Sequence, residues 1–213
     1  MTPSDNRLLV LYAGLAAAVA GLIFFVHYHP ISSFDLYVTE ESQELGMRHL
    51  TAAMRGISIF GDSMVASLSI ILASTLFFVT HRRREAGFVL AIPIADLLNA
   101  LVKMLVNRPR PTSDDAELLT KAGQSSFPSG HVVHYVVFFG FLLAVMSADK
   151  KIPSFWRIVI GVFSAFLILS ISISRIYLGA HWATDVIGGY LFGFAYLGLI
   201  LRFYLKDPEL ERP

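Results

Sequence analysis

The chain has 213 residues, of which 55% are hydrophobic and only 15% are charged. This composition is too apolar for an ordinary soluble domain and is typical of an integral membrane protein. The absence of cysteine excludes disulfides and thiolate metal sites, and a net charge of +1 gives no indication of a nucleic-acid partner.

Six apolar segments have roughly the 20 residues that a helix needs to cross a bilayer. The first covers residues 8–26 and is uncharged. An uncleaved helix is favoured over a signal peptide there, because the segment is long and no convincing small-residue cleavage site follows it. The other five segments are residues 57–80, 86–106, 132–148, 158–174 and 183–203. We therefore predict an all-α membrane bundle of six transmembrane helices that forms a single domain over residues 1–213.

The distribution of Lys and Arg predicts the orientation of these spans. Ten of these residues fall on one side of the membrane if both termini are cytoplasmic: Arg7, Arg82, Arg83, Arg84, Lys150, Lys151, Arg157, Arg202, Lys206 and Arg212. On the opposite side Lys and Arg are fewer and are mixed with Asp and Glu, Asp35 among them. We therefore predict that both termini are cytoplasmic.

The segment between the first two spans, residues 30–56, is mixed rather than apolar. Its apolar residues recur near helical spacing with charges between them, which predicts one or two amphipathic helices on the outer membrane surface. Such a segment is either a lateral gate over a lipid site or a plain interfacial connector, and the sequence does not decide between the two.

The first of three polar clusters at the predicted outer ends of the spans is KMLVNRPRP, which closes the third span. Pro109 and Pro111 predict that the helix ends near Asn107, because proline disfavours helical geometry in the residue before it. Lys103 then lies about one turn inside the membrane, and Arg110 folds back from the loop. Two cations that reach from a helix end to the interface would give the same pattern.

The second cluster, FPSGH, opens the fourth span at residues 127–131. A proline and Ser129 before an apolar run are typical of a helix start, and free amides at a helix N-terminus, such as that of Gly130, form an anion site. His131 would lie beside that anion. The alternative is a capping turn with an interfacial histidine. We interpret His134, one turn further on, as a packing residue or an indirect partner of the site.

The third cluster, SRIYLGAHWATD at residues 174–185, combines a cation, a nucleophile and a carboxylate. His181 and Asp185 are four residues apart and share one face of a helix, unless the helix begins between them. A bond from the ring N–H to the carboxylate fixes the tautomer and leaves the other nitrogen free to attack. Arg175 offers a planar fork suited to two phosphate oxygens.

Together the clusters supply three cations, a run of amides, two histidines and one carboxylate, which suffice for phosphoryl transfer. A metal-dependent phosphatase would show several acidic ligands in one place, whereas only Asp185 accompanies the histidines here. We therefore predict that no metal and no cofactor is required. Asp96, deeper in the third span, is interpreted as a buried partner for Lys103 or for a polar group on another helix.

The three clusters resemble the signature motifs of the type 2 phosphatidic acid phosphatase (PAP2) superfamily: K-x6-RP at residues 103–111, PSGH at 128–131 and SR-x5-H-x3-D at 174–185. The resemblance implies that His181 is the nucleophile that forms a phosphohistidine, that Asp185 orients it, and that His131 is the general acid. The phosphate-binding residues that it implies are Lys103, Arg110, Ser129, Gly130 and Arg175. His134 and Arg108 lie outside the motifs, and we assign them no role.

The resemblance also implies a lipid substrate. The size of the chain and the layout of its spans are similar to those of bacterial members of the superfamily that dephosphorylate undecaprenyl diphosphate or phosphatidylglycerophosphate. We expect hydrolysis of undecaprenyl diphosphate to the monophosphate at the outer face of a bacterial inner (plasma) membrane. Phosphatidylglycerophosphate and phosphatidate are the alternatives, because the motifs do not encode the shape of the head-group pocket.

Two further classes of protein remain as hypotheses. A non-catalytic lipid-phosphate binder or flippase would need only the cations and amides, so the intact His131, His181 and Asp185 argue against it. The soluble vanadate-binding haloperoxidases resemble the family at the phosphate site. The six apolar spans argue against the hypothesis that this chain is one of them.

Overall fold

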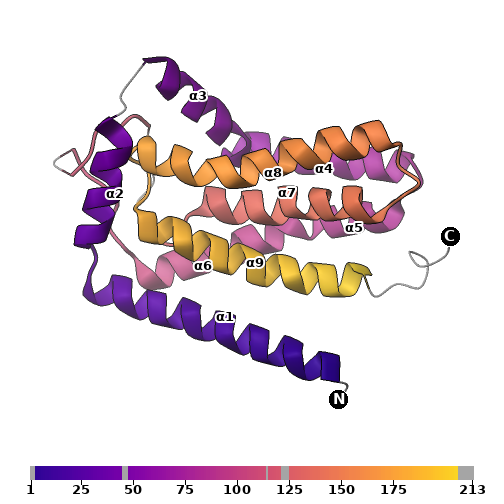
Figure 1. Cartoon of the computed structure of the whole chain (residues 1–213), viewed down its shortest axis with the longest axis horizontal. Coiled ribbons are helices and arrows are strands. Elements are labelled where there is room, and N and C mark those ends of the chain that lie inside the picture. Colours follow the sequence, from indigo (N-terminus) through magenta and orange to yellow (C-terminus); the bar gives the residue numbers. More distant parts are fainter. Residues whose placement is uncertain (1–2, 45–47, 114, 121–124, 206–213) are drawn as a thin grey trace.

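The computed structural model describes residues 3–44, 48–113, 115–120 and 125–205, with side chains from residue 10 onward. Within these ranges the secondary structure is helical and contains no strand (Figure 1). The helices are α1 (Pro3–Tyr28), α2 (Ser33–Glu44), α3 (Arg48–Ser58), the 3-10 turn η1 (Ile59–Gly61), α4 (Ser63–Val79), α5 (Arg83–Leu90), α6 (Ile92–Val106), α7 (Gly130–Ala148), α8 (Ser154–Tyr177) and α9 (Ala183–Leu205). The predicted all-α class is confirmed.

In the described part of the chain, five helical segments are long and apolar enough to cross a membrane: residues 10–28, residues 83–106 over α5 and α6, and the helices α7, α8 and α9. A sixth span results if α3, η1 and α4 are counted together, because they pass the same test but are bent by 57°. The predicted second span, residues 57–80, is therefore not one continuous helix. Its helical path begins earlier, at Arg48, and is interrupted at Asp62.

Helix α7 lies at the centre of the bundle and packs against α8, α9 and α6 (Figure 1). It is buried over most of its length, which accounts for its apolar residues on every face. Helix α9 approaches it closely through glycines, since a Cβ at Gly189 would lie 2.9 Å from the Ser129 carbonyl oxygen. The close contact sets the beginning of α9 against the beginning of α7.

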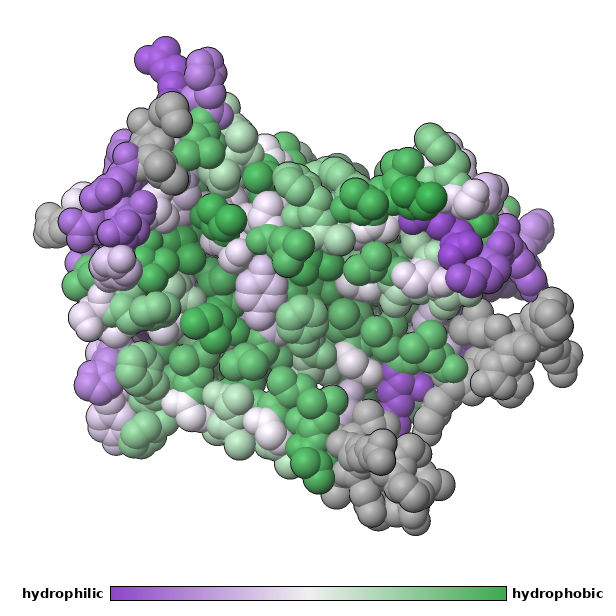
Figure 2. All heavy atoms as spheres, viewed as in Figure 1, coloured by the Kyte–Doolittle hydropathy of each residue, from purple (hydrophilic) through white to green (hydrophobic). Residues whose placement is uncertain are grey.

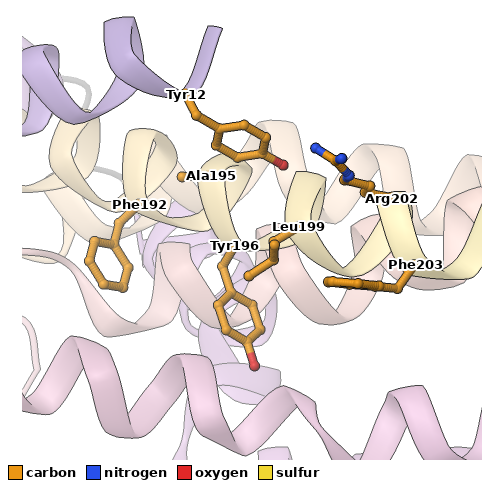
Figure 3. Close-up of a pocket in the computed structure, with 7 residues that line it drawn as sticks. All are labelled: Tyr12, Phe192, Ala195, Tyr196, Leu199, Arg202 and Phe203. Carbon is orange, nitrogen blue, oxygen red and sulfur yellow. The ribbon is translucent and has the colours of Figure 1, made fainter. Parts of the chain in front are cut away.

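Helix α1 is the least buried span and packs along α9. A groove of about 580 Å³ lies between the two helices, lined by Tyr12 of α1 and by Phe192, Tyr196 and Leu199 of α9 (Figure 3). Phe192 is seven residues beyond Asp185, or about two helical turns. The groove therefore lies along the half of α9 that points away from the three motifs.

Hydrophilic residues gather at the two ends of the molecule, and an apolar belt separates them (Figure 2). At one end an ion pair of 2.9 Å between Arg82 and Asp149 joins the α4–α5 turn to the α7–α8 turn. The three motifs lie at the opposite end. This separation agrees with the predicted sidedness, while the direction across the membrane stays a prediction. Lys206 and Arg212, which entered that prediction, lie outside the described residues.

The segment 30–56 forms two helices, α2 and α3, as its amphipathic pattern predicts. The face of α2 that packs on the bundle is polar, since Asp35 and Thr39 are buried whereas Phe34 and Tyr37 are exposed. Helix α2 contacts α8 and α9. It is therefore docked on the motif end of the bundle, and its placement at a membrane surface stays a prediction.

Candidate active site

The three motifs meet where α6 ends, α7 begins, and the chain passes from α8 to α9. Helix α6 ends at Val106, and Asn107 caps it in the left-handed conformation (φ 45°), as the two prolines predict. The chain then turns back, and Arg110 donates a hydrogen bond of 2.5 Å to the Ala180 carbonyl oxygen beside His181. The first motif is thereby brought against the third.

His181 lies in the loop between α8 and α9 and is 2% exposed. Its Nδ1 is 3.4 Å from Asp185 Oδ2, and its Nε2 is 3.2 Å from Arg110 Nη1. With the ring proton on Nδ1, the lone pair of Nε2 faces the cation. Burial, followed by the charges of Arg110, Lys103 and Arg175, lowers the pKa of His181 well below 6.5. The imidazole is therefore neutral at pH 7, which is the form that a nucleophile requires.

Asp185 lies in the first turn of α9 and is fully buried. Its Oδ2 accepts the Trp182 N–H at 2.9 Å and the Ser126 hydroxyl. Its Oδ1 accepts a hydrogen bond of 2.5 Å from Arg108 Nη1. Helix α9 begins between His181 and Asp185, which is one of the alternatives that the sequence left open. The carboxylate nevertheless faces the imidazole ring. The carboxylate is held from several sides.

Arg108 is the site residue that sequence reasoning missed. It is 2% exposed and lies between two carboxylates, with Nη1 2.5 Å from Asp185 and Nη2 2.7 Å from Asp35 of α2. Its Nε donates to the Pro30 carbonyl oxygen at 2.9 Å, and Nη1 donates to the Thr184 hydroxyl at 2.7 Å. We name the row Asp35–Arg108–Asp185 the buried triad. The signal in the sequence was RPRP, which has two arginines where the motif needs one.

Asp35 completes the buried triad from the side of α2. Its Oδ1 accepts the backbone N–H of Thr184 at 2.9 Å, directly before Asp185, and it is 0% exposed. The sequence analysis had counted Asp35 only as an acid that dilutes positive charge on the outer side. Its fully buried position shows that it supports the start of α9.

The predicted phosphate-binding residues surround His181. Lys103 Nζ donates to the Ser125 and Ser126 carbonyl oxygens at 3.2 and 3.1 Å, and Arg175 Nη1 donates to Ser58 Oγ at 3.0 Å. Ser129 is the N-cap of α7, but its hydroxyl does not cap that helix. It is therefore free to turn toward a ligand.

Eight buried side-chain nitrogen or oxygen atoms of the described residues have no hydrogen-bond partner, and four of them belong to the motifs. These four are Arg110 Nε, Ser129 Oγ, His131 Nε2 and Arg175 Nε. Buried polar atoms without partners are rare and call for an explanation. Arg110 Nε, Ser129 Oγ and Arg175 Nε can each donate a hydrogen bond, so the oxygens of a phosphate group fit these three together with the Gly130 amide at the N-terminus of α7.

The structure separates His134 from this site. Its Nδ1 lies 3.1 Å from Asp96 Oδ2, and its ring stacks on Phe138. These contacts agree with the interpretation of His134 as a packing residue or an indirect partner of the site, and Asp96 is the partner of a polar group on another helix, as interpreted from the sequence. Over the described residues, no group of three or more His, Asp or Glu side chains is arranged to hold a metal ion.

The comparisons with known proteins agree on one family. Residues 84–209 match the family model described as the PAP2 superfamily. Phosphatidylglycerophosphatase B of Bacillus subtilis is 29% identical over 96% of this chain and 95% of its own length. The undecaprenyl-diphosphatase of Sulfolobus acidocaldarius is 29% identical over 67% of this chain and 66% of its own length.

The solved structures show the same fold. A transmembrane PAP2 type phosphatidylglycerolphosphate phosphatase from Bacillus subtilis superposes with a TM-score of 0.79 at 23% identity, over 92% of this chain and 96% of its own. LpxE from Aquifex aeolicus superposes with a TM-score of 0.64 at 23% identity, over 80% and 96%.

A multi-pass helical bundle with these motifs at one end defines a membrane-bound, metal-independent lipid phosphatase. Because the family model covers more than half of the sequence, the chain belongs to the PAP2 superfamily. The resemblance drawn from the three motifs is confirmed.

Proposed function

We propose that this protein cleaves the terminal phosphate from a membrane lipid through a phosphohistidine on His181, at the outer face of a bacterial inner membrane. The observation that supports this most is the position of His181 Nε2, which lies 3.2 Å from Arg110 Nη1 while Nδ1 faces Asp185. A phosphate held by that guanidinium places its phosphorus within reach of a neutral imidazole nitrogen.

In the first step, His181 Nε2 attacks phosphorus, and the bond from phosphorus to the leaving oxygen breaks. The leaving oxygen takes the bonding pair and receives a proton from His131. Asp185 stabilises the positive charge that develops on the His181 ring, since Oδ2 lies beside Nδ1. Lys103, Arg110 and Arg175, with the Ser129 hydroxyl and the Gly130 amide, hold the three equatorial oxygens as charge builds on them.

In the second step, water attacks the phosphohistidine in line with the N–P bond. His131, now neutral, takes a proton from that water, the N–P bond breaks, and the electron pair returns to Nε2 of His181. Inorganic phosphate leaves, and both histidines regain their starting protonation. The proposed cycle therefore needs neither a metal ion nor a cofactor to move its protons.

Phosphatidylglycerophosphate is the first candidate substrate. The similarity to phosphatidylglycerophosphatase B of Bacillus subtilis spans nearly the whole of both chains, whereas the similarity to the undecaprenyl-diphosphatase of Sulfolobus acidocaldarius covers about two thirds of each. Undecaprenyl diphosphate, which the sequence analysis placed first, is the second candidate. It is retained because two curated relatives act as undecaprenyl-diphosphatases.

A panel of lipids tests the proposed function. The purified protein is incubated with phosphatidylglycerophosphate, phosphatidate and undecaprenyl diphosphate in the presence of EDTA, and released phosphate is measured. We expect turnover of the first lipid to exceed that of the others. Absence of phosphate release from every lipid, or strict loss of activity with the chelator, would contradict the proposal.

The proposed orientation places the loop after α6 outside the cell and the α7–α8 turn in the cytoplasm. Because the chain contains no cysteine, one introduced cysteine reports one position. Ser113→Cys changes an exposed residue of the loop after α6, and Lys150→Cys changes an exposed residue of the α7–α8 turn. In intact cells a membrane-impermeant maleimide should label the first variant and should label the second only after the membrane is permeabilised. The reverse pattern would show that the orientation is inverted.

A further inference from the structure

Asp62 is a carboxylate at the break between η1 and α4, and no signature motif includes it. Its Oδ1 lies 3.4 Å from His131 Nε2. Position 61 before it is glycine, because a Cβ there would clash with the His131 ring. The bend of 57° between α3–η1 and α4 therefore places this segment directly against the predicted general acid.

The Asp62 side chain does not serve its own helix. It occupies the N-cap position of α4, where aspartate usually accepts a hydrogen bond from the first turn, yet it makes no capping bond. An aspartate within the candidate span 48–79 that forgoes this stabilisation needs another reason, because ionisable groups at such positions are costly. In the structure, the neighbour that explains an aspartate at this position is His131.

His131 needs an anionic neighbour if it is to donate a proton. Its site also contains the cations Arg175 and Arg110, and like charges that share a site repel. Its Nε2 is buried and makes no hydrogen bond. Catalytic hydrogen bonds are often long in an empty site and shorten when substrate binds. A short adjustment of Asp62 would allow Nε2–H to donate to it, which would leave Nδ1 as the ring nitrogen that gives its proton to the leaving oxygen.

We infer that Asp62 is the positioning residue of the general acid and that it selects lipid phosphate monoesters, whose leaving group is an alcohol, over diphosphates. The inference rests on the proposed function, since it assigns His131 the role of proton donor. When the P–O bond of a monoester breaks, the alkoxide takes the bonding pair and a proton from Nδ1 of His131. An alkoxide is strongly basic, so this proton is essential to its departure.

A diphosphate places different demands on the same position. Its leaving group is a lipid monophosphate, which stabilises the negative charge on its own oxygens and depends less on a proton. It also brings further negative charge to the site, and Asp62, whose side chain is 64% exposed, lies beside the predicted general acid, so the like charges repel. The same carboxylate therefore favours one substrate class and disfavours the other.

The test compares wild type with Asp62→Asn on phosphatidylglycerophosphate and undecaprenyl diphosphate, with kcat and KM measured separately. We expect kcat for the monoester to fall by about 10²-fold and kcat for the diphosphate to change by less than about threefold. The ratio of kcat for the diphosphate to kcat for the monoester should thus rise by more than tenfold. Asp62→Glu, which keeps the charge, should recover much of the monoester rate.

Asp96→Asn is the matched control, because it removes a carboxylate that pairs with His134 of the same helix α7 at 3.1 Å. This variant should leave the ratio of the kcat values on the two substrates unchanged. An equal fall on both substrates with Asp62→Asn would show a structural role or an effect on phosphate binding through Arg175, and would overturn the inference. That result is distinct from failure of the proposed function, in which wild type itself releases no phosphate.

Discussion

Replacing His181 with alanine is expected to reduce kcat by roughly 10⁴-fold or more, the size typical of removing a nucleophile. The reason is that Nε2 is the atom that attacks phosphorus, and no neighbouring group can take its place. The cations and amides remain in this variant, so the phosphate site should still bind vanadate, a phosphate analogue. Phosphate release from the preferred lipid and vanadate binding are therefore measured on the same preparation.

The control for this variant is His49→Ala, which removes an exposed histidine of α3. It should keep turnover close to that of wild type. Near-normal turnover in His181→Ala would rule out the phosphohistidine mechanism. Equal loss of turnover and of vanadate binding would show instead that the substitution disrupts the site as a whole.

Replacing Arg108 with methionine is expected to destabilise the protein by about 3–5 kcal/mol, the usual cost of removing one partner of a buried ion pair. The guanidinium is the counter-charge for both Asp35 and Asp185, and all three side chains are at most 2% exposed. Without it two carboxylates face each other in a site that excludes water. The unfolding midpoint in detergent measures the loss.

Two comparisons show whether the loss arises from the buried charges. Arg48→Met removes an exposed arginine of α3 and should change stability by less than about 0.5 kcal/mol. The double variant Arg108→Met with Asp35→Asn should be more stable than Arg108→Met alone, because it leaves one buried carboxylate instead of two. Additive losses from the two substitutions would contradict the coupling that the geometry indicates.

The sequence predicts the fold class and the chemistry of the motifs because both depend on local patterns. A span of apolar residues is recognisable from composition alone, and prolines at positions 109 and 111 end α6 where expected. The eight predicted site residues, with Lys103 and His181 among them, come from three motifs that the structure brings to one end of the bundle. Their individual roles stay predictions until variants are measured.

What the sequence could not predict depends on contacts between distant segments. Arg108 and Asp35 are 73 residues apart, and nothing near either one indicates that the two pair. Asp62 lies within a predicted span, and its approach to His131 requires the bend after Gly61, which hydropathy does not reveal. The role of each of these residues depends on a side chain from a distant segment, which no local pattern in the sequence identifies.

The buried triad has a consequence for how the protein can be divided. The segment that identifies the family, residues 84–209, contains every signature position and also Arg108. It does not contain Asp35, which supplies half of the negative charge that balances this arginine. A fragment of residues 84–209 would thus carry the complete inventory of motifs but would lack one of the two carboxylates that hold this arginine, and with it the hydrogen bond from Thr184 that ties α2 to the start of α9. The stretch by which the family is recognised is therefore smaller than the unit that must fold for the site to be intact.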